Sequence, residues 1–165
     1  MPADARSICW NGPRPSEVRG RTANRCMTAL SFLDTNILLY AHDRDAGDKH
    51  VRAKALLTEL WDSGEGCLSP QVLQEFFVNV TKKIPQPLAV PLAREIMRNY
   101  RPWIRVPADG PLVVRATEIA EAWHISFWEG MIVAAAEGCG AAILFSEYLQ
   151  NGQRIAGLRI VNPFA

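Results

Sequence analysis

Short apolar runs alternate with longer amphipathic segments along most of this chain, and this alternation constrains the fold more than any other feature. Five runs have the length of strands: residues 31–33, 66–69, 103–106, 141–145 and 158–161. Between them, apolar residues recur mostly at helical spacing: residues 50–61, 70–84, 91–100, 111–123 and 127–137. Strands that alternate with helices predict a parallel sheet covered on both faces, and therefore an α/β fold.

Length and composition allow one domain with one core. The chain has 165 residues, of which 48% are apolar. We expect the domain to span residues 27–165. Residues 1–26 hold Pro, Gly and dispersed Arg without an apolar face, so we expect this segment to be disordered or loosely attached. Met27 precedes the first strand directly, and a start there would make residues 1–26 either an artefact of the assigned start or a dispensable tail.

Charge, hydropathy and cysteine usage narrow the class of protein. The net charge is +1, and residues 1–27 hold five Arg, so no basic field along the domain predicts a nucleic-acid partner. The longest apolar run, Met131 to Ala136, is far shorter than the ~20 residues of a membrane span. Residues 1–27 lack the apolar core of a secretory signal. Four scattered Cys form no Cys-x-x-Cys pair, so we expect a cytoplasmic protein without a membrane partner.

Two acidic residues follow predicted strands directly. Asp34 comes after Phe32-Leu33 and before the helical run that begins at Ile37, and Glu147 follows the run 141–145. Ligands of open α/β sheets bind outside the carboxyl ends of the strands, so both carboxylates are placed for chemistry. The alternative for Asp34 is that it only caps the helix, since Asp is a favoured N-cap residue.

Two further carboxylates lie on predicted helices. Glu75 points away from the apolar stripe of helix 70–84 and forms a polar row with Gln71 and Asn79, which alternatively is a solvated helix face. Glu129 lies in the first turn of the helix 127–137, which has no polar face over most of its length and which we therefore expect to be buried. A capping box with Ser126 is the structural alternative for Glu129.

These carboxylates point to one kind of chemistry if they meet. Oxygen ligands suit Mg²⁺ or Mn²⁺ rather than zinc, and a divalent cation relieves the repulsion between crowded carboxylates. Such an ion lowers the pKa of bound water and neutralises charge on a phosphoryl group. Metal-assisted phosphodiester hydrolysis is therefore the predicted reaction class.

From about residue 28 to residue 165, the chain resembles a PIN domain and, within that superfamily, the VapC-type toxin ribonucleases. The resemblance rests on five segments: residues 32–36 (Phe-Leu-Asp-Thr-Asn), 69–76, 126–129 (Ser-Phe-Trp-Glu), 146–153 and 162–164. It implies a three-layer α/β/α sandwich around a parallel sheet of about five short strands. It also implies a divalent metal, cleavage of single-stranded or loop RNA, a homodimer, and inhibition by a small antitoxin partner.

The resemblance assigns roles to individual positions. Asp34 and Glu75 match the first two acidic residues, and Asn36 matches a polar residue that supports the metal site. Glu129 stands where the family ordinarily has Asp after Trp, and Tyr148 stands where it has Asp after Ser-Glu. Both departures fall in the metal site, because Glu is one methylene longer than Asp and Tyr is neutral at pH 7.

Three functions stay open from the sequence. The first is a Mg²⁺- or Mn²⁺-dependent endoribonuclease toxin. Its catalytic and metal residues would be Asp34, Glu75 and Glu129, with Glu147 as a further metal ligand and Asn36, Ser126 and Tyr148 in support. The second is a catalytically impaired module that binds antitoxin or RNA, motivated by Glu129 and Tyr148. The third is an aspartyl-phosphate protein of the haloacid-dehalogenase type with Asp34 as nucleophile, which Asn36 disfavours because a second Asp is usual there.

Overall fold

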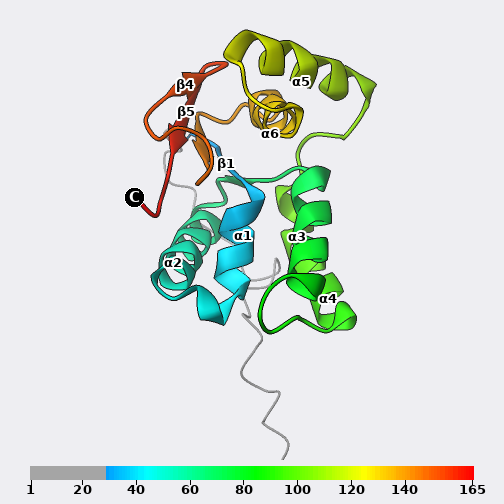
Figure 1. The fold of residues 1–165 in the computed structure, drawn as a ribbon, viewed down its shortest axis with the longest axis vertical. Coiled ribbons are helices and arrows are strands. Elements are labelled where there is room, and N and C mark those ends of the chain that lie inside the picture. Colours follow the sequence, from blue (N-terminus) through cyan, green and yellow to red (C-terminus); the bar gives the residue numbers. More distant parts are fainter. Residues whose placement is uncertain (1–28) are drawn as a thin grey trace, which may run out of the picture.

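A five-stranded sheet forms the centre of the computed structural model, which describes residues 29–165 (Figure 1). The expected disordered segment 1–26 and the alternative start at Met27 lie outside the described residues. The sheet order is β2-β1-β3-β5-β4. Its strands are β1 (Ser31–Leu33), β2 (Gly66–Cys67), β3 (Ile143–Phe145), β4 (Arg154–Ile155) and β5 (Leu158–Val161). All pairings are parallel except that of β4 with β5, so the sheet is mostly parallel, as predicted.

Within residues 29–165, six α-helices flank the sheet. They are α1 (Thr35–His42), α2 (Asp48–Ser63), α3 (Pro70–Lys82), α4 (Val90–Tyr100), α5 (Gly110–Trp123) and α6 (Phe127–Gly138). Two 3₁₀ turns, η2 (Arg44–Ala46) and η3 (Arg101–Trp103), complete the described elements. In the view of Figure 1, α5 and α6 lie above β1 and the other four helices lie below it. The predicted α/β/α class is therefore confirmed.

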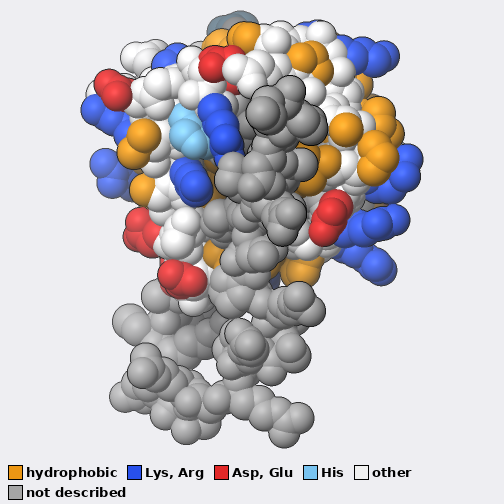
Figure 2. Space-filling model, turned by 90° about the horizontal axis from the view of Figure 1, so that it is seen from below, with side chains coloured by type: hydrophobic (Ala, Val, Ile, Leu, Met, Phe, Trp, Pro, Cys, Tyr) orange, Lys and Arg blue, Asp and Glu red, His pale blue; other side chains and the backbone are white. Residues whose placement is uncertain are grey.

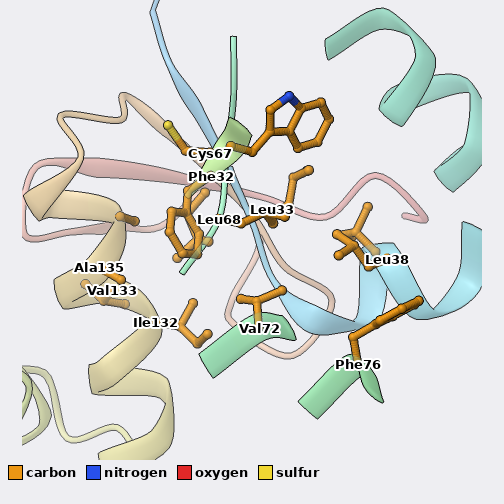
Figure 3. Packing of buried hydrophobic residues seen from close by; sticks show 14 of the residues in the cluster. Phe32, Leu33, Leu38, Cys67, Leu68, Val72, Phe76, Ile132, Val133 and Ala135 are labelled. Atoms are coloured by element: carbon orange, nitrogen blue, oxygen red, sulfur yellow. The ribbon is translucent and has the colours of Figure 1, made fainter. Parts of the chain in front are cut away.

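The core lies where β1 and β2 meet α1, α3 and α6 (Figure 3). Phe32 of β1 and Phe76 of α3 are fully buried there. The start of α3 is fixed locally, because the Ser69 hydroxyl accepts from Val72 N (3.5 Å) and Pro70 occupies the first turn. This start sets the rotation of α3, and with it the side on which Glu75 projects.

One predicted strand of the sheet is wrong. The run 103–106 is not a strand: Trp103 ends η3, and Ile104 makes only an isolated parallel bridge with Leu68. Prolines on both sides of the run, at 102 and 107, remove backbone donors that a longer ladder would need. The fifth strand is instead β4, which pairs with β5 through a tight turn where Ala156 and Gly157 have φ of 49° and 83°.

The aromatic residues around the α5–α6 connection are also more exposed than predicted. Trp123 falls on the apolar stripe of the predicted helix 111–123, which predicts an inward-facing side chain, but it is 40% exposed. At the start of α6, Trp128 is 65% exposed. From Gly130 to Ala136, however, α6 is buried. The predicted all-round burial therefore holds only for the part of α6 that has entered the core.

The outer surface carries mixed charge. On the face shown in Figure 2, basic, acidic and apolar side chains are interspersed, in keeping with the net charge of +1. Within residues 29–165, every helix is too short or too polar to cross a bilayer. Any affinity for a charged ligand must therefore come from local groups rather than from a global field.

A partly buried histidine makes the stability of this fold depend on pH. His42 packs edge-on against Phe76 (5.3 Å between ring centroids), and its Nε2 lies 3.1 Å from the Tyr100 hydroxyl. Burial lowers the pKa of His42 from its ordinary 6.5 to about 4. Between these values the unfolded chain binds a proton that the folded chain excludes, so stability falls as the pH falls. The full loss from this residue is about 3 kcal/mol.

Urea unfolding of the wild type and His42→Gln at pH 7 and pH 4 measures this effect. We expect the variant to lose less stability on acidification than the wild type, because it has no imidazole to protonate. His124→Gln, at an exposed position, is the matched control and should behave like the wild type. Equal acid losses in all three proteins would show that another group governs the acid response.

Candidate active site

A pocket of about 330 Å³ opens at the carboxyl end of β1, between α1, α3 and α6. Three predicted catalytic residues line it, one from each of these helices or its cap: Asp34, Glu75 and Glu129. The three predicted supporting residues, Asn36, Ser126 and Tyr148, line it as well. The geometric convergence on which the predicted chemistry depends is therefore present.

Asp34 both caps α1 and faces the pocket. Its Oδ1 accepts from Thr35 N (2.6 Å), and its Oδ2 accepts from Asn36 Nδ2 (2.9 Å) and Ser146 Oγ (2.7 Å). Burial raises the pKa of Asp34 and the nearby charge of Glu75 adds to this, although the hydrogen bonds from Ser146 and Thr35 oppose it. The capping and functional interpretations are thus compatible, and the carboxylate is held in one orientation.

Glu75 is held through both of its oxygens. Thr35 Oγ1 donates to Oε2 (2.7 Å) and Gln71 Nε2 donates to Oε1 (2.8 Å). The polar row of Gln71, Glu75 and Asn79 lines the pocket and is not merely a solvated face. The role of Thr35 was missed from the sequence, since no local spacing links residues 40 positions apart.

Glu129 occupies the predicted capping box. Ser126 N donates to Glu129 Oε2 (2.8 Å), and Glu129 N donates to Ser126 Oγ (3.2 Å). The capping box leaves Oε1 outside these bonds, and the residue is only partly buried. A structural role for Glu129 is therefore present, and its place in the pocket wall allows a second one.

The structure places Glu147 apart from the other three carboxylates. It accepts from the Tyr40 hydroxyl (2.6 Å) and forms an ion pair with Lys49, and it does not line the pocket. Burial acts to raise the pKa of Glu147, but the hydrogen bonds from Lys49 and Tyr40 outweigh this and lower it. Its neighbour Tyr148 lines the pocket and is 73% exposed. At this position the pocket wall therefore carries a phenol group instead of a carboxylate.

The donors in the pocket fit a hard divalent cation in their chemistry. All candidate ligands are oxygens, and two buried amide oxygens in the pocket wall, Asn36 Oδ1 and Gln71 Oε1, have no hydrogen-bond partner. Among residues 29–165, however, no three His, Cys, Asp or Glu side chains already stand together as a metal site. Asp34 and Glu75 are therefore the candidates for direct ligands of the ion. Glu129 would bind the ion through a water molecule, or directly after its hydrogen bond with Ser126 N is broken.

Comparison with known proteins agrees with this architecture. The DNA-bound VapBC structure from Salmonella typhimurium is 19% identical with a TM-score of 0.55, and the match covers 81% of this chain and 97% of that one. VapBC2 from Rickettsia felis, bound to a promoter DNA fragment, is 15% identical (TM-score 0.51; 79% and 96% covered). FitAcB from Neisseria gonorrhoeae is 17% identical (TM-score 0.52; 82% and 99% covered).

The family of this chain is assigned from its sequence, because structures of such low identity show only the fold. No curated protein sequence matches the chain. The model of the PIN domain family, by contrast, matches residues 31–147, which is more than half of the sequence. The matched range contains Asp34, Glu75 and Glu129, together with the residues that hydrogen-bond to their carboxylates. The chain therefore belongs to the PIN domain family.

Proposed function

We propose that this protein is a cytoplasmic, metal-dependent endoribonuclease toxin of the VapC type that cleaves single-stranded or loop RNA. The observation that carries the proposal is the meeting of Asp34, Glu75 and Glu129 in one pocket of a PIN domain. The structural neighbours are VapBC and FitAB-type complexes, which supports a cognate antitoxin as partner. We also propose a homodimer.

In this proposal Asp34 and Glu75 would hold Mg²⁺ or Mn²⁺, with Glu129 of α6 assisting. When bound, the ion supplies charge neutralisation at the phosphoryl group and a water of lowered pKa. Ser146 and Asn36 fix the orientation of Asp34, while Thr35 and Gln71 fix that of Glu75. These bonds hold the two carboxylates ready, so little reorganisation is needed on binding.

A second candidate function is a binding module with impaired turnover. Glu129 is engaged in a capping box, and Tyr148 adds no charge where the family has a carboxylate. The described residues also hold no preassembled group of three metal-ligating side chains. Under this alternative the protein keeps its antitoxin- or RNA-binding surface and has lost catalysis.

A cleavage assay on single-stranded RNA separates the two. We expect the wild type to cut in Mn²⁺ or Mg²⁺, to stop on addition of a chelator, and to resume with excess Mn²⁺. The double variant Glu129→Asp with Tyr148→Asp restores the family's residues and serves as the comparison. An inert wild type beside an active double variant would establish the impaired module. Two inert proteins at every metal concentration would refute the nuclease.

A further inference from the structure

A second cavity adjoins the candidate active site across Trp128. It has a volume of about 420 Å³ and shares four wall residues with the first pocket: Gln71, Glu75, Asn79 and Trp128. Its remaining wall is formed by Gln74, Val78 and Lys83. The two cavities therefore form one groove along α3, acidic at one end and with a basic side chain at the other, and Trp128 lies at their junction.

The indole of Trp128 is presented to this groove rather than used in the core. It is 65% exposed and belongs to the first turn of α6, ahead of the buried part of the helix. Phe127 packs edge-on against the indole, with 5.2 Å between ring centroids. The backbone oxygen of Trp128 accepts from Gln71 Nε2 (3.5 Å). The ring is thus exposed but supported, which lowers the entropic cost of stacking a ligand on it.

An aromatic face beside a phosphate-directed pocket matches the chemistry of an unpaired nucleotide. Bases stack on aromatic side chains, amides such as those of Gln74 and Asn79 bond base edges, and lysine contacts phosphates. We propose that Trp128 and the second cavity form a nucleotide subsite for single-stranded RNA. The base next to the cleaved phosphate stacks on the indole, and Lys83 faces the following phosphate. The identity of the ligand rests on the proposed function.

This subsite accounts for a preference for single strands. A base inside a duplex has both faces covered by its neighbours, so it cannot stack on Trp128 without being extruded. The acidic pocket alone makes no such distinction, because phosphates are present in both forms. Selection for unpaired RNA therefore falls to the aromatic side of the groove.

Binding of a single-stranded probe in EDTA tests the subsite directly, because the proposed hydrolysis needs the divalent ion and the probe therefore stays intact. The probe is a short, end-labelled oligoribonucleotide without self-complementarity, and its binding is measured by fluorescence anisotropy. Trp128→Leu should weaken binding by about 5- to 150-fold, the range of one base–aromatic stack, whereas Trp128→Phe should stay within about 3-fold. Lys83→Gln should reduce the slope of log affinity against log salt by about 1.

The matched control is Trp123→Leu, which alters another exposed tryptophan that lines neither cavity. It should leave the affinity unchanged. The subsite is refuted if the wild type does not bind the probe, if Trp128→Leu binds normally, or if Trp128→Phe loses as much as Trp128→Leu. It is also refuted if Trp128→Leu weakens only the binding of an antitoxin peptide.

The probe separates this inference from the nuclease proposal. Probe binding that depends on Trp128 in a protein that cuts no RNA would support the subsite and refute the proposed catalysis. RNA cleavage by the wild type, together with unchanged probe binding by Trp128→Leu, would refute the subsite and support the catalysis.

Discussion

Replacing Asp34 by Asn is expected to reduce RNA cleavage at saturating Mn²⁺ by at least about 100-fold, beyond what outer-sphere changes commonly cost. The substitution removes one of the two charges that face each other in the pocket, but it keeps the shape of the side chain. The amide oxygen still accepts from Thr35 N, so the N-cap of α1 persists. Initial cleavage rates across a Mn²⁺ titration measure the effect.

The same substitution at a second N-cap provides the control. Asp109 caps α5 by accepting from Leu112 N (3.1 Å), is exposed, and lies outside the pocket. Asp109→Asn should cut RNA at the wild-type rate. Thermal unfolding adds an independent measurement, since ion at 100 times its Kd should stabilise the wild type by about 2.7 kcal/mol and Asp34→Asn much less. Cleavage by Asp34→Asn at the wild-type rate would show that this pocket is not the active site.

Gly130→Ala should destabilise the protein by about 2–3 kcal/mol, near the upper end of the usual cost of overpacking. An added Cβ would lie 2.5 Å from the Ala116 carbonyl oxygen and 3.2 Å from Ala120 Cβ. Because the nearest atom is backbone, α5 and α6 must separate, and this cost exceeds the helix propensity that Ala gains. The midpoint and slope of urea unfolding measure the change.

Gly138→Ala tests whether the cause is the contact with α5 or the loss of glycine itself. This residue lies in the same helix, and its added Cβ would meet only Val106 Cγ1 at 3.3 Å. A side-chain methyl group moves more easily than a backbone carbonyl, so we expect a change below about 1 kcal/mol. Equal losses in both variants would contradict the close approach of α5 and α6.

Helix positions could be predicted closely because their signals are local. The pair Ser69-Pro70 is typical of a helix start, because it combines a capping hydroxyl with a proline in the first turn, and α3 does begin there. The apolar stripe around Phe76 indicates the buried side of the helix. With that side known, Glu75 had to project opposite, and it does line the pocket. The placement of Asp34 after a strand rested on a general rule for parallel sheets. The sequence could therefore predict that Asp34 and Glu75 lie close together, since the position of each one follows from its own helix or strand.

Features that depend on tertiary contacts could not be predicted. The bond from Thr35 to Glu75 and the partners of Glu147 join distant segments, and no spacing in the sequence encodes them. Strand β4 has two residues, too few for an alternating pattern to register. The exposure of Trp128 depends on how far α6 extends past its neighbours. The apolar pattern of this helix does not distinguish its exposed first turn from its buried part.

The sheet ends on both sides in strands of only two residues, β2 and β4. An edge strand recruits a second chain by offering a row of unsatisfied amide and carbonyl groups. Edges this short provide too few such groups to align another copy, so polymerisation through a continuous ladder gains little. The proposed homodimer would therefore have to form through side-chain contacts rather than through a shared ladder, and substitutions could tune such contacts without disturbing the strands.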